Sequence, residues 1–274
     1  MKYDDFFKLY STKLLNWFMK IIFFFIVLFW YGFVFCEESS RKEYVIQPQL
    51  DIPLTVSAAM LALYGSYRLN EMELQDKIVK KSDLLIWDRP WAGVWHPNAD
   101  LASDVLSVFA ITPLAIGAVS YFKDDIKGSE FGALTLMLLQ TMAIQSGLNL
   151  MVRSTQLWPR PCIFSENGGD ARFKGEAYGS FYSGHASAAF SVAVLTSTWF
   201  QNTYSSSKYI PYLWATSLSL ATTVSVLRVV AGKHYPTDVI AGALMGTLVS
   251  ISVLKIHEHQ SPSLSIQVGP NYLG

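Results

Sequence analysis

The sequence predicts an all-α fold, a bundle of six transmembrane helices. Of its residues, 51% are hydrophobic and only 15% are charged, compared with roughly 25% charged residues in an ordinary soluble domain. Six segments are also apolar over about the length that crosses a bilayer. The mean hydropathy of +0.27 is modest for a protein with many spans. A soluble helical protein with long buried helices is therefore the alternative fold.

The chain begins with a candidate targeting segment. An apolar run at 21–36 follows Lys8, Lys13 and Lys20, which is typical of a signal peptide or an N-terminal membrane anchor. We assign residues 1–36 to this segment, with cleavage after Cys36 left open, residues 37–256 to the main domain, and 257–274 to a polar C-terminal tail.

The six apolar segments lie at 52–69, 101–121, 130–151, 186–201, 209–228 and 237–256. Several contain Ser, Thr and Gln, which suits helices that pack against other helices rather than facing lipid on all sides. Gly242 and Gly246 are four residues apart, and this spacing predicts close packing of the last helix against a neighbour.

Two long polar connections, 70–100 and 152–184, separate these segments. The first contains Trp87, Trp91 and Trp95 beside Asp88, a composition typical of the membrane interface. We expect it to anchor the protein there, with a lid over a lipid headgroup as the alternative. Long loops in compact domains tend to be functional, which draws attention to the second connection.

Composition also excludes some functions. The net charge is zero and no block of Lys and Arg occurs, so a nucleic-acid partner is not expected. The two cysteines, Cys36 and Cys162, define no disulfide framework. His257 and His259 lie in the polar tail, where solvated side chains are a better interpretation than metal ligands. We therefore expect no metal and no cofactor.

Three clusters at predicted helix ends carry charges suited to binding phosphate. They contain Arg153 and Arg160, then Ser183, Gly184 and His185, then Arg228, His234 and Asp238. A guanidinium group matches phosphate oxygens with a planar set of donors. Ser183 is placed to cap a helix whose free N–H groups would also face an anion. These residues predict a phosphate cradle.

The histidines in these clusters predict catalysis. Asp238 follows His234 by four positions, within reach of one imidazole nitrogen, which would leave the other nitrogen free to attack phosphorus. His185 could give a proton to the leaving oxygen. Each residue alone has an ordinary structural explanation, but the set and its order do not.

In these three clusters the chain resembles the type 2 phosphatidic-acid phosphatase (PAP2) superfamily, in its membrane lipid-phosphatase branch. The family pattern is Lys-x6-Arg-Pro, then Pro-Ser-Gly-His, then Ser-Arg-x5-His-x3-Asp. The resemblance implies a six-helix core, shared with haloperoxidases, and metal-independent phosphate removal through a phosphohistidine. It implies that His234 attacks, His185 protonates the leaving group and Asp238 supports the nucleophile, while the cationic positions hold phosphate.

The chain departs from this pattern at three positions. Arg153 stands at the usual Lys, Tyr182 at the Pro, and Leu227 at the Ser. These changes put substrate preference in more doubt than chemistry. The alternatives are a lipid phosphotransferase, a vanadium-dependent haloperoxidase, and a catalytically impaired phospholipid-binding protein.

The expected partners are a phosphorylated lipid substrate and membrane lipids, and the sequence leaves the oligomeric state open. Positive charges are nearly balanced between the two sides: Lys77, Lys80 and Lys81 lie on one, Lys123, Lys127, Lys208 and Lys255 on the other. On the resemblance alone, we expect an integral protein of the cell inner membrane with its active site on the periplasmic face.

Overall fold

The computed structural model describes residues 41–72, 79–168 and 172–258. The proposed targeting segment 1–36 and residues 259–274 of the tail lie outside these ranges. The helices are α2 (Pro48–Asn70), α3 (Pro97–Leu106), α4 (Thr112–Phe122), α5 (Gly128–Arg153), α6 (Gly184–Thr203), α7 (Ile210–Val230) and α8 (Pro236–His257). A 3-10 helix, η3 (Ser107–Ile111), joins α3 to α4.

The all-α fold class is confirmed, since the described residues contain helices and no strand longer than an isolated bridge. Each predicted apolar segment lies within an observed helix or helix pair, except that 209–228 begins one residue before α7. By length and composition, four helical stretches are long and apolar enough to cross a membrane: Pro97–Phe122, Gly128–Arg153, Ile210–Val230 and Pro236–His257. These stretches indicate an integral membrane protein. Of the six transmembrane helices predicted from the sequence, these four are supported.

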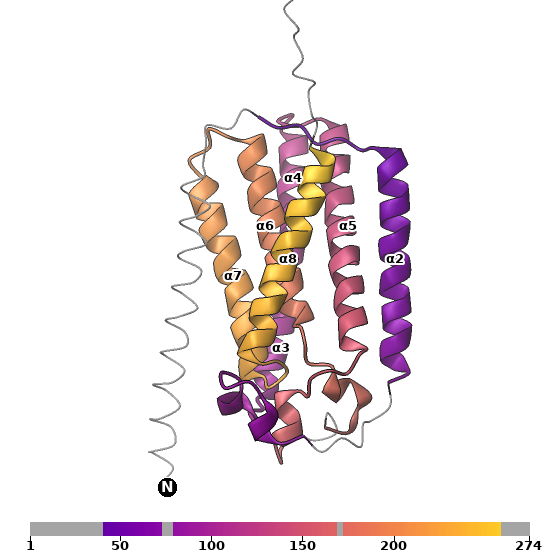
Figure 1. Cartoon of the computed structure of the whole chain (residues 1–274). Coiled ribbons are helices and arrows are strands. Elements are labelled where there is room, and N and C mark those ends of the chain that lie inside the picture. Colours follow the sequence, from indigo (N-terminus) through magenta and orange to yellow (C-terminus); the bar gives the residue numbers. More distant parts are fainter. Residues whose placement is uncertain (1–40, 73–78, 169–171, 259–274) are drawn as a thin grey trace, which may run out of the picture.

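Helix α6 is not among these four apolar stretches, and it lies inside the bundle. It packs mainly against α7 and α8 and also contacts α5 (Figure 1). Its buried positions include small and hydroxyl-bearing residues such as Ser187, Ala189 and Ser191. The Ser191 hydroxyl donates to the Gly246 carbonyl over 3.1 Å. A helix surrounded by other helices needs close packing more than it needs a lipid-compatible surface.

The contact between α6 and α8 depends on the two predicted packing glycines. A Cβ atom at Gly246 would lie 2.1 Å from the Ser187 carbonyl oxygen, and one at Gly242 would lie 2.5 Å from that of Ser183. Both distances are far shorter than van der Waals contact. The sequence prediction of close packing at these glycines is therefore confirmed.

A buried polar cluster ties α2 to α8 and α5 near the C-terminal end of α8. The His257 Nε2 and Asp51 Oδ1 atoms lie 2.9 Å apart, and both side chains are buried. Gln140 of α5 donates to the same Asp51 oxygen over 3.2 Å. The expectation that His257 is a solvated tail residue is therefore wrong. The helix extends through this residue, and Asp51 supplies its partner.

At the other end of the bundle, four helix termini meet. Helices α5 and α7 end there, and α6 and α8 begin there, with the connecting segments 79–96, 154–168 and 172–183 covering them (Figure 1, lower end). All three sequence clusters lie at these termini.

Candidate active site

His234 lies in the short connection between α7 and α8 and is only 3% exposed. Its backbone N–H donates to the Arg228 carbonyl over 3.3 Å. Its Nδ1 atom is 2.8 Å from the carbonyl oxygen of Ser180. Because a carbonyl only accepts hydrogen bonds, Nδ1 carries the hydrogen and Nε2 carries the lone pair. The ring is thus held in the tautomer in which Nε2 is nucleophilic.

Asp238 supports His234 differently from the sequence expectation. Its Oδ2 atom is 3.7 Å from His234 Nδ1, which is too long for a hydrogen bond. The same oxygen accepts from the Ser180 hydroxyl over 2.6 Å and from the Tyr235 N–H over 2.9 Å. Asp238 therefore fixes Ser180 and caps α8, and Ser180 contacts the imidazole.

Sequence reasoning missed Ser180. It lies more than fifty positions before His234 and Asp238, in a loop without periodicity. Its hydroxyl binds Asp238 while its carbonyl binds His234, so one residue connects both. A serine three residues before Ser183 carries no signal that would single it out.

The surroundings of His234 disfavour its protonation. Complete burial, followed by the charges of Arg160, Arg228 and Arg153, lowers the pKa of His234 well below its usual value. The imidazole is therefore neutral at pH 7, as a nitrogen nucleophile must be.

Arg153 and Arg160 share one carboxylate. The Glu176 Oε2 atom lies 3.1 Å from Arg153 Nη2 and 3.6 Å from Arg160 Nη2. Arg153 Nε also donates to the Gly179 carbonyl over 3.2 Å. Burial on its own raises the pKa of Glu176, but the charges of Arg160 and Arg153 outweigh it and lower that pKa below its ordinary value. Glu176 is therefore ionised between these two arginines.

Arg228 is held by the first turns of α3, and this contact was absent from the sequence analysis. Its Nη1 atom lies 2.5 Å from Asp100 Oδ1, 2.9 Å from Ser103 Oγ and 3.4 Å from Asp104 Oδ1. Lys233 Nζ pairs with the other Asp100 oxygen over 2.9 Å. The spacing of Asp100, Ser103 and Asp104 places them on one helical face, which is the signal that was available.

The second cluster stands at the start of α6. Ser183 is the expected N-cap, with its hydroxyl 3.4 Å from the Ala186 N–H. His185 lies in the first turn, with Nε2 3.0 Å from Asp104 Oδ1. At Gly184 a Cβ atom would lie 2.7 Å from the Asn149 side-chain oxygen. The glycine thus lets the end of α5 approach this turn.

Asn149 also bears on the departure at Tyr182. Its side-chain amide donates to the Tyr182 carbonyl over 2.6 Å, and both residues are buried. A side-chain hydrogen bond therefore fixes the backbone where the family pattern has a rigid proline.

The Trp-rich connection is partly buried against the site. Trp87 is 66% exposed, but Trp91 is 8% exposed and packs in a core cluster with Tyr235 of the α7–α8 connection. Asp88 accepts hydrogen bonds from the Thr237 hydroxyl and N–H. Interfacial anchoring, expected for the whole segment, is therefore wrong for Asp88 and Trp91, which stabilise the first turn of α8.

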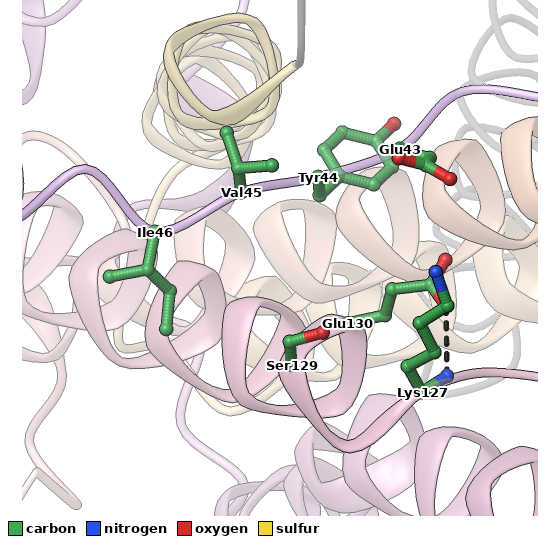
Figure 2. A pocket seen from close by; sticks show the side chains of 7 residues that line it. All are labelled: Glu43, Tyr44, Val45, Ile46, Lys127, Ser129 and Glu130. Carbon is green, nitrogen blue, oxygen red and sulfur yellow. Dashed lines mark hydrogen bonds between the residues drawn. The ribbon is translucent and has the colours of Figure 1, made fainter.

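Within the described ranges, no three His, Cys, Asp or Glu side chains converge as metal ligands would. A pocket of about 290 Å³ lies elsewhere, where the chain segment before α2 meets the start of α5 (Figure 2). Its lining residues are Glu43, Tyr44, Val45, Ile46, Lys127, Ser129 and Glu130. None of them belongs to the three clusters.

The structure therefore brings all the predicted site residues to one end of the bundle, and adds Ser180, Glu176, Asp100, Ser103, Asp104 and Lys233.

Comparison with known proteins agrees with the sequence resemblance. No curated protein matches the chain. Among solved structures, it is similar to the crystal structure of Aquifex aeolicus LpxE, with 21% sequence identity and a TM-score of 0.40, over 67% of this chain and 99% of that chain. The sequence model of the PAP2 superfamily matches residues 132–262, which include all three clusters. The chain thus carries a PAP2-superfamily domain over these residues.

Proposed function

We propose that this protein is a membrane phosphatase that hydrolyses a lipid-linked phosphomonoester or pyrophosphate through a phosphohistidine on His234. The observation that carries the proposal is the 2.8 Å contact between His234 Nδ1 and the Ser180 carbonyl. It leaves the lone pair on Nε2, in a buried ring surrounded by three arginines.

The first chemical step forms the phosphohistidine. Nε2 of His234 attacks phosphorus, and the bond from phosphorus to the lipid oxygen breaks. The leaving oxygen takes a proton from His185. Positive charge on the imidazole is supported by the Ser180 carbonyl at Nδ1 and by the Asp238 carboxylate behind it.

The second step regenerates the enzyme. A water molecule attacks phosphorus and gives a proton to His185, the bond from phosphorus to Nε2 breaks, and orthophosphate leaves. In this step His185 acts as a base, as microscopic reversibility requires when it acts as the acid in the first. No metal takes part in either step.

Unpartnered donors support phosphate binding by the arginines. Among the described residues, the buried Nε atoms of Arg160 and Arg228 have no hydrogen-bond partner. Such groups are costly to bury, and phosphate oxygens would satisfy them. The capped N-terminus of α6 at Ser183 and Gly184 adds N–H groups that favour an anion.

The position of the site supports a lipid substrate. The arginines and histidines lie at the ends of helices apolar enough to cross a bilayer, so a phosphate at the membrane surface could reach them while its acyl or prenyl chains stay in the membrane. We place the site on the periplasmic face of the inner membrane. A reporter fused to the C-terminal tail would test this assignment.

The decisive assay measures phosphate release by purified protein from phosphatidate, phosphatidylglycerol phosphate, a polyprenyl pyrophosphate and a phosphorylated glycolipid. We expect release from at least one of them, retained in chelator and abolished in His234→Ala. His96→Ala, at an exposed histidine, is the matched control. Brief incubation with radiolabelled substrate should trap label that is stable to alkali and labile to acid, as phosphohistidine is. Release from none of these lipids would overturn the hydrolase proposal, and transfer to an added alcohol without release would identify a phosphotransferase.

A further inference from the structure

We infer that Asp104 is a positioning residue for His185: its carboxylate orients the imidazole and favours the protonated ring that donates to the leaving oxygen. This inference rests on the proposed function, and it adds a residue that lies outside the three sequence clusters. It also assigns a catalytic purpose to the packing of α3 against α7, which places Asp104 beside the first turn of α6.

The geometry of the pair is direct. Asp104 Oδ1 lies 3.0 Å from His185 Nε2, which is hydrogen-bonding distance. Asp104 follows Ser103 on α3, and Ser103 is fully buried and donates to the Asp100 carbonyl over 2.6 Å. The Asp104 side chain therefore extends from a fixed turn of helix, and the imidazole it contacts is itself in the first turn of α6.

Asp100 and Asp104 contact different sets of positively charged or titratable side chains. Asp100 lies 2.5 Å from Arg228 and 2.9 Å from Lys233, and in the described part of the chain it forms no hydrogen bond or ion pair with His185. Asp104 is 3.4 Å from Arg228 and closer to His185. The two carboxylates are one helical turn apart, so Asp100 is a matched control for the effect of Asp104.

Four charged or titratable groups face His185. Burial of the ring and the charge of Arg228 of α7 lower the pKa of His185 below its usual value, and Asp104 and Asp100 of α3 act against this shift. His234, from the connection before α8, is near enough to interact electrostatically. Since the cations needed for phosphate binding oppose protonation of His185, a nearby carboxylate is required if that ring is to serve as an acid.

The first test compares leaving groups. An alkyl phosphate needs a proton on its leaving oxygen, whereas an aryl phosphate with an acidic phenol does not. Asp104→Asn should lower kcat for the alkyl substrate roughly tenfold, compared with the hundredfold or more that loss of a general acid costs, and should leave the aryl substrate nearly unaffected. Its alkaline limb in the pH–rate profile should also move to lower pH. Asp100→Asn should instead raise KM for both substrates and move that limb less than Asp104→Asn does, and Asp104→Glu should restore most of the alkyl activity.

The second test does not depend on activity. In full-length protein with labelled histidine, the NMR titration midpoint of His185 should fall by about one pH unit in Asp104→Asn and by less in Asp100→Asn. An unchanged midpoint, or equal losses on alkyl and aryl substrates, would overturn the inference. In another outcome, the wild-type protein releases no phosphate while its His185 midpoint still lies above that of Asp104→Asn. That result would refute the proposed function and support the pairing of Asp104 with His185.

Discussion

The Ser180 hydroxyl donates to Asp238 Oδ2 over 2.6 Å, so the carboxylate behind the proposed nucleophile reaches it through a serine. The Ser180 carbonyl, in turn, is the hydrogen-bond partner of His234 Nδ1. This arrangement fixes the imidazole tautomer by a backbone group that no side-chain substitution removes.

Asp238→Asn should therefore impair catalysis less than His234→Ala does. Where an aspartate bonds directly to a catalytic histidine, its replacement by Asn costs about 10⁴-fold in kcat. Here we expect a loss of roughly 10- to 100-fold, because the tautomer stays fixed by Ser180 while charge support for the imidazolium is lost. Steady-state kinetics on a lipid phosphate measure this loss. A loss as large as that of His234→Ala would show that Asp238 bonds to the ring during turnover.

Glu176→Gln should strengthen phosphate binding. The carboxylate lies between Arg153 and Arg160 and competes with a phosphate anion for them. For a partly exposed ion pair worth up to about 1 kcal/mol, we expect the inhibition constant of inorganic phosphate to fall up to roughly fivefold. Glu166→Gln, at an exposed glutamate of the same loop, should leave it unchanged. Weaker inhibition in Glu176→Gln would mean that Glu176 organises the arginines.

As the pH falls, the stability of the folded protein should decrease before His234 is protonated in the folded state. The pKa of His234 in the folded protein is well below its usual value, whereas in the unfolded chain it is about 6.5. As pH falls below about 6.5, the unfolded chain takes up a proton that the folded protein excludes, so stability decreases.

Thermal unfolding measured at pH 7.5 and 5.5 tests this linkage. Wild-type protein should lose more stability between these two pH values than His234→Gln does. The acid limb of kcat should lie below pH 6.5, since the neutral imidazole persists there. An acid limb at or above that pH would contradict the depressed pKa of His234.

Asp51→Ala should destabilise the fold and leave the chemistry intact. It would leave His257 without its buried partner and remove one of the acceptors of the Gln140 amide, at a cost of about 3 kcal/mol. The cluster lies at the opposite end of the bundle from His234, so kcat of the folded fraction should not change. Denaturation and kinetics together measure both effects, with Glu43→Ala, at an exposed carboxylate, as the neutral control.

Gly246→Ala should disrupt the contact between α6 and α8. Its Cβ would lie 2.1 Å from the Ser187 carbonyl oxygen, and such overpacking costs about 3 kcal/mol or more. Gly132→Ala on α5 is the matched control, since its Cβ would lie 3.8 Å from Ile46 Cδ1. Equal melting temperatures for the two variants would show that α8 moves aside without cost.

The sequence predicted the helices well because each apolar segment has the length of a span, and the observed helices extend only a few residues beyond them. It also placed the site residues at helix ends. Ser103 and Asp104 were missed because they lie on a segment treated only as apolar, and Asp100 because it ends the polar connection before that segment, although the spacing of the three puts them on one face. Ser180 and Glu176 were missed for a different reason, since loop residues acquire their partners only through tertiary structure.

His257 shows the converse failure. Its sequence neighbours Glu258 and His259 are polar, so local composition indicated solvent, but its partner Asp51 is about two hundred residues away. A single residue with a distant partner leaves no periodic signal.

The glycine contact between α6 and α8 has a consequence for how the protein tolerates its lipid environment. His185 is the second residue of one of these helices and His234 lies two residues before the other, so the spacing between them is set by two backbones in direct contact. Bilayers of different thickness tilt helices by small amounts at modest cost, and helices at the periphery, such as α2, are freest to respond. We expect turnover to vary little with acyl-chain length in the surrounding membrane, because the central helix pair moves as one unit.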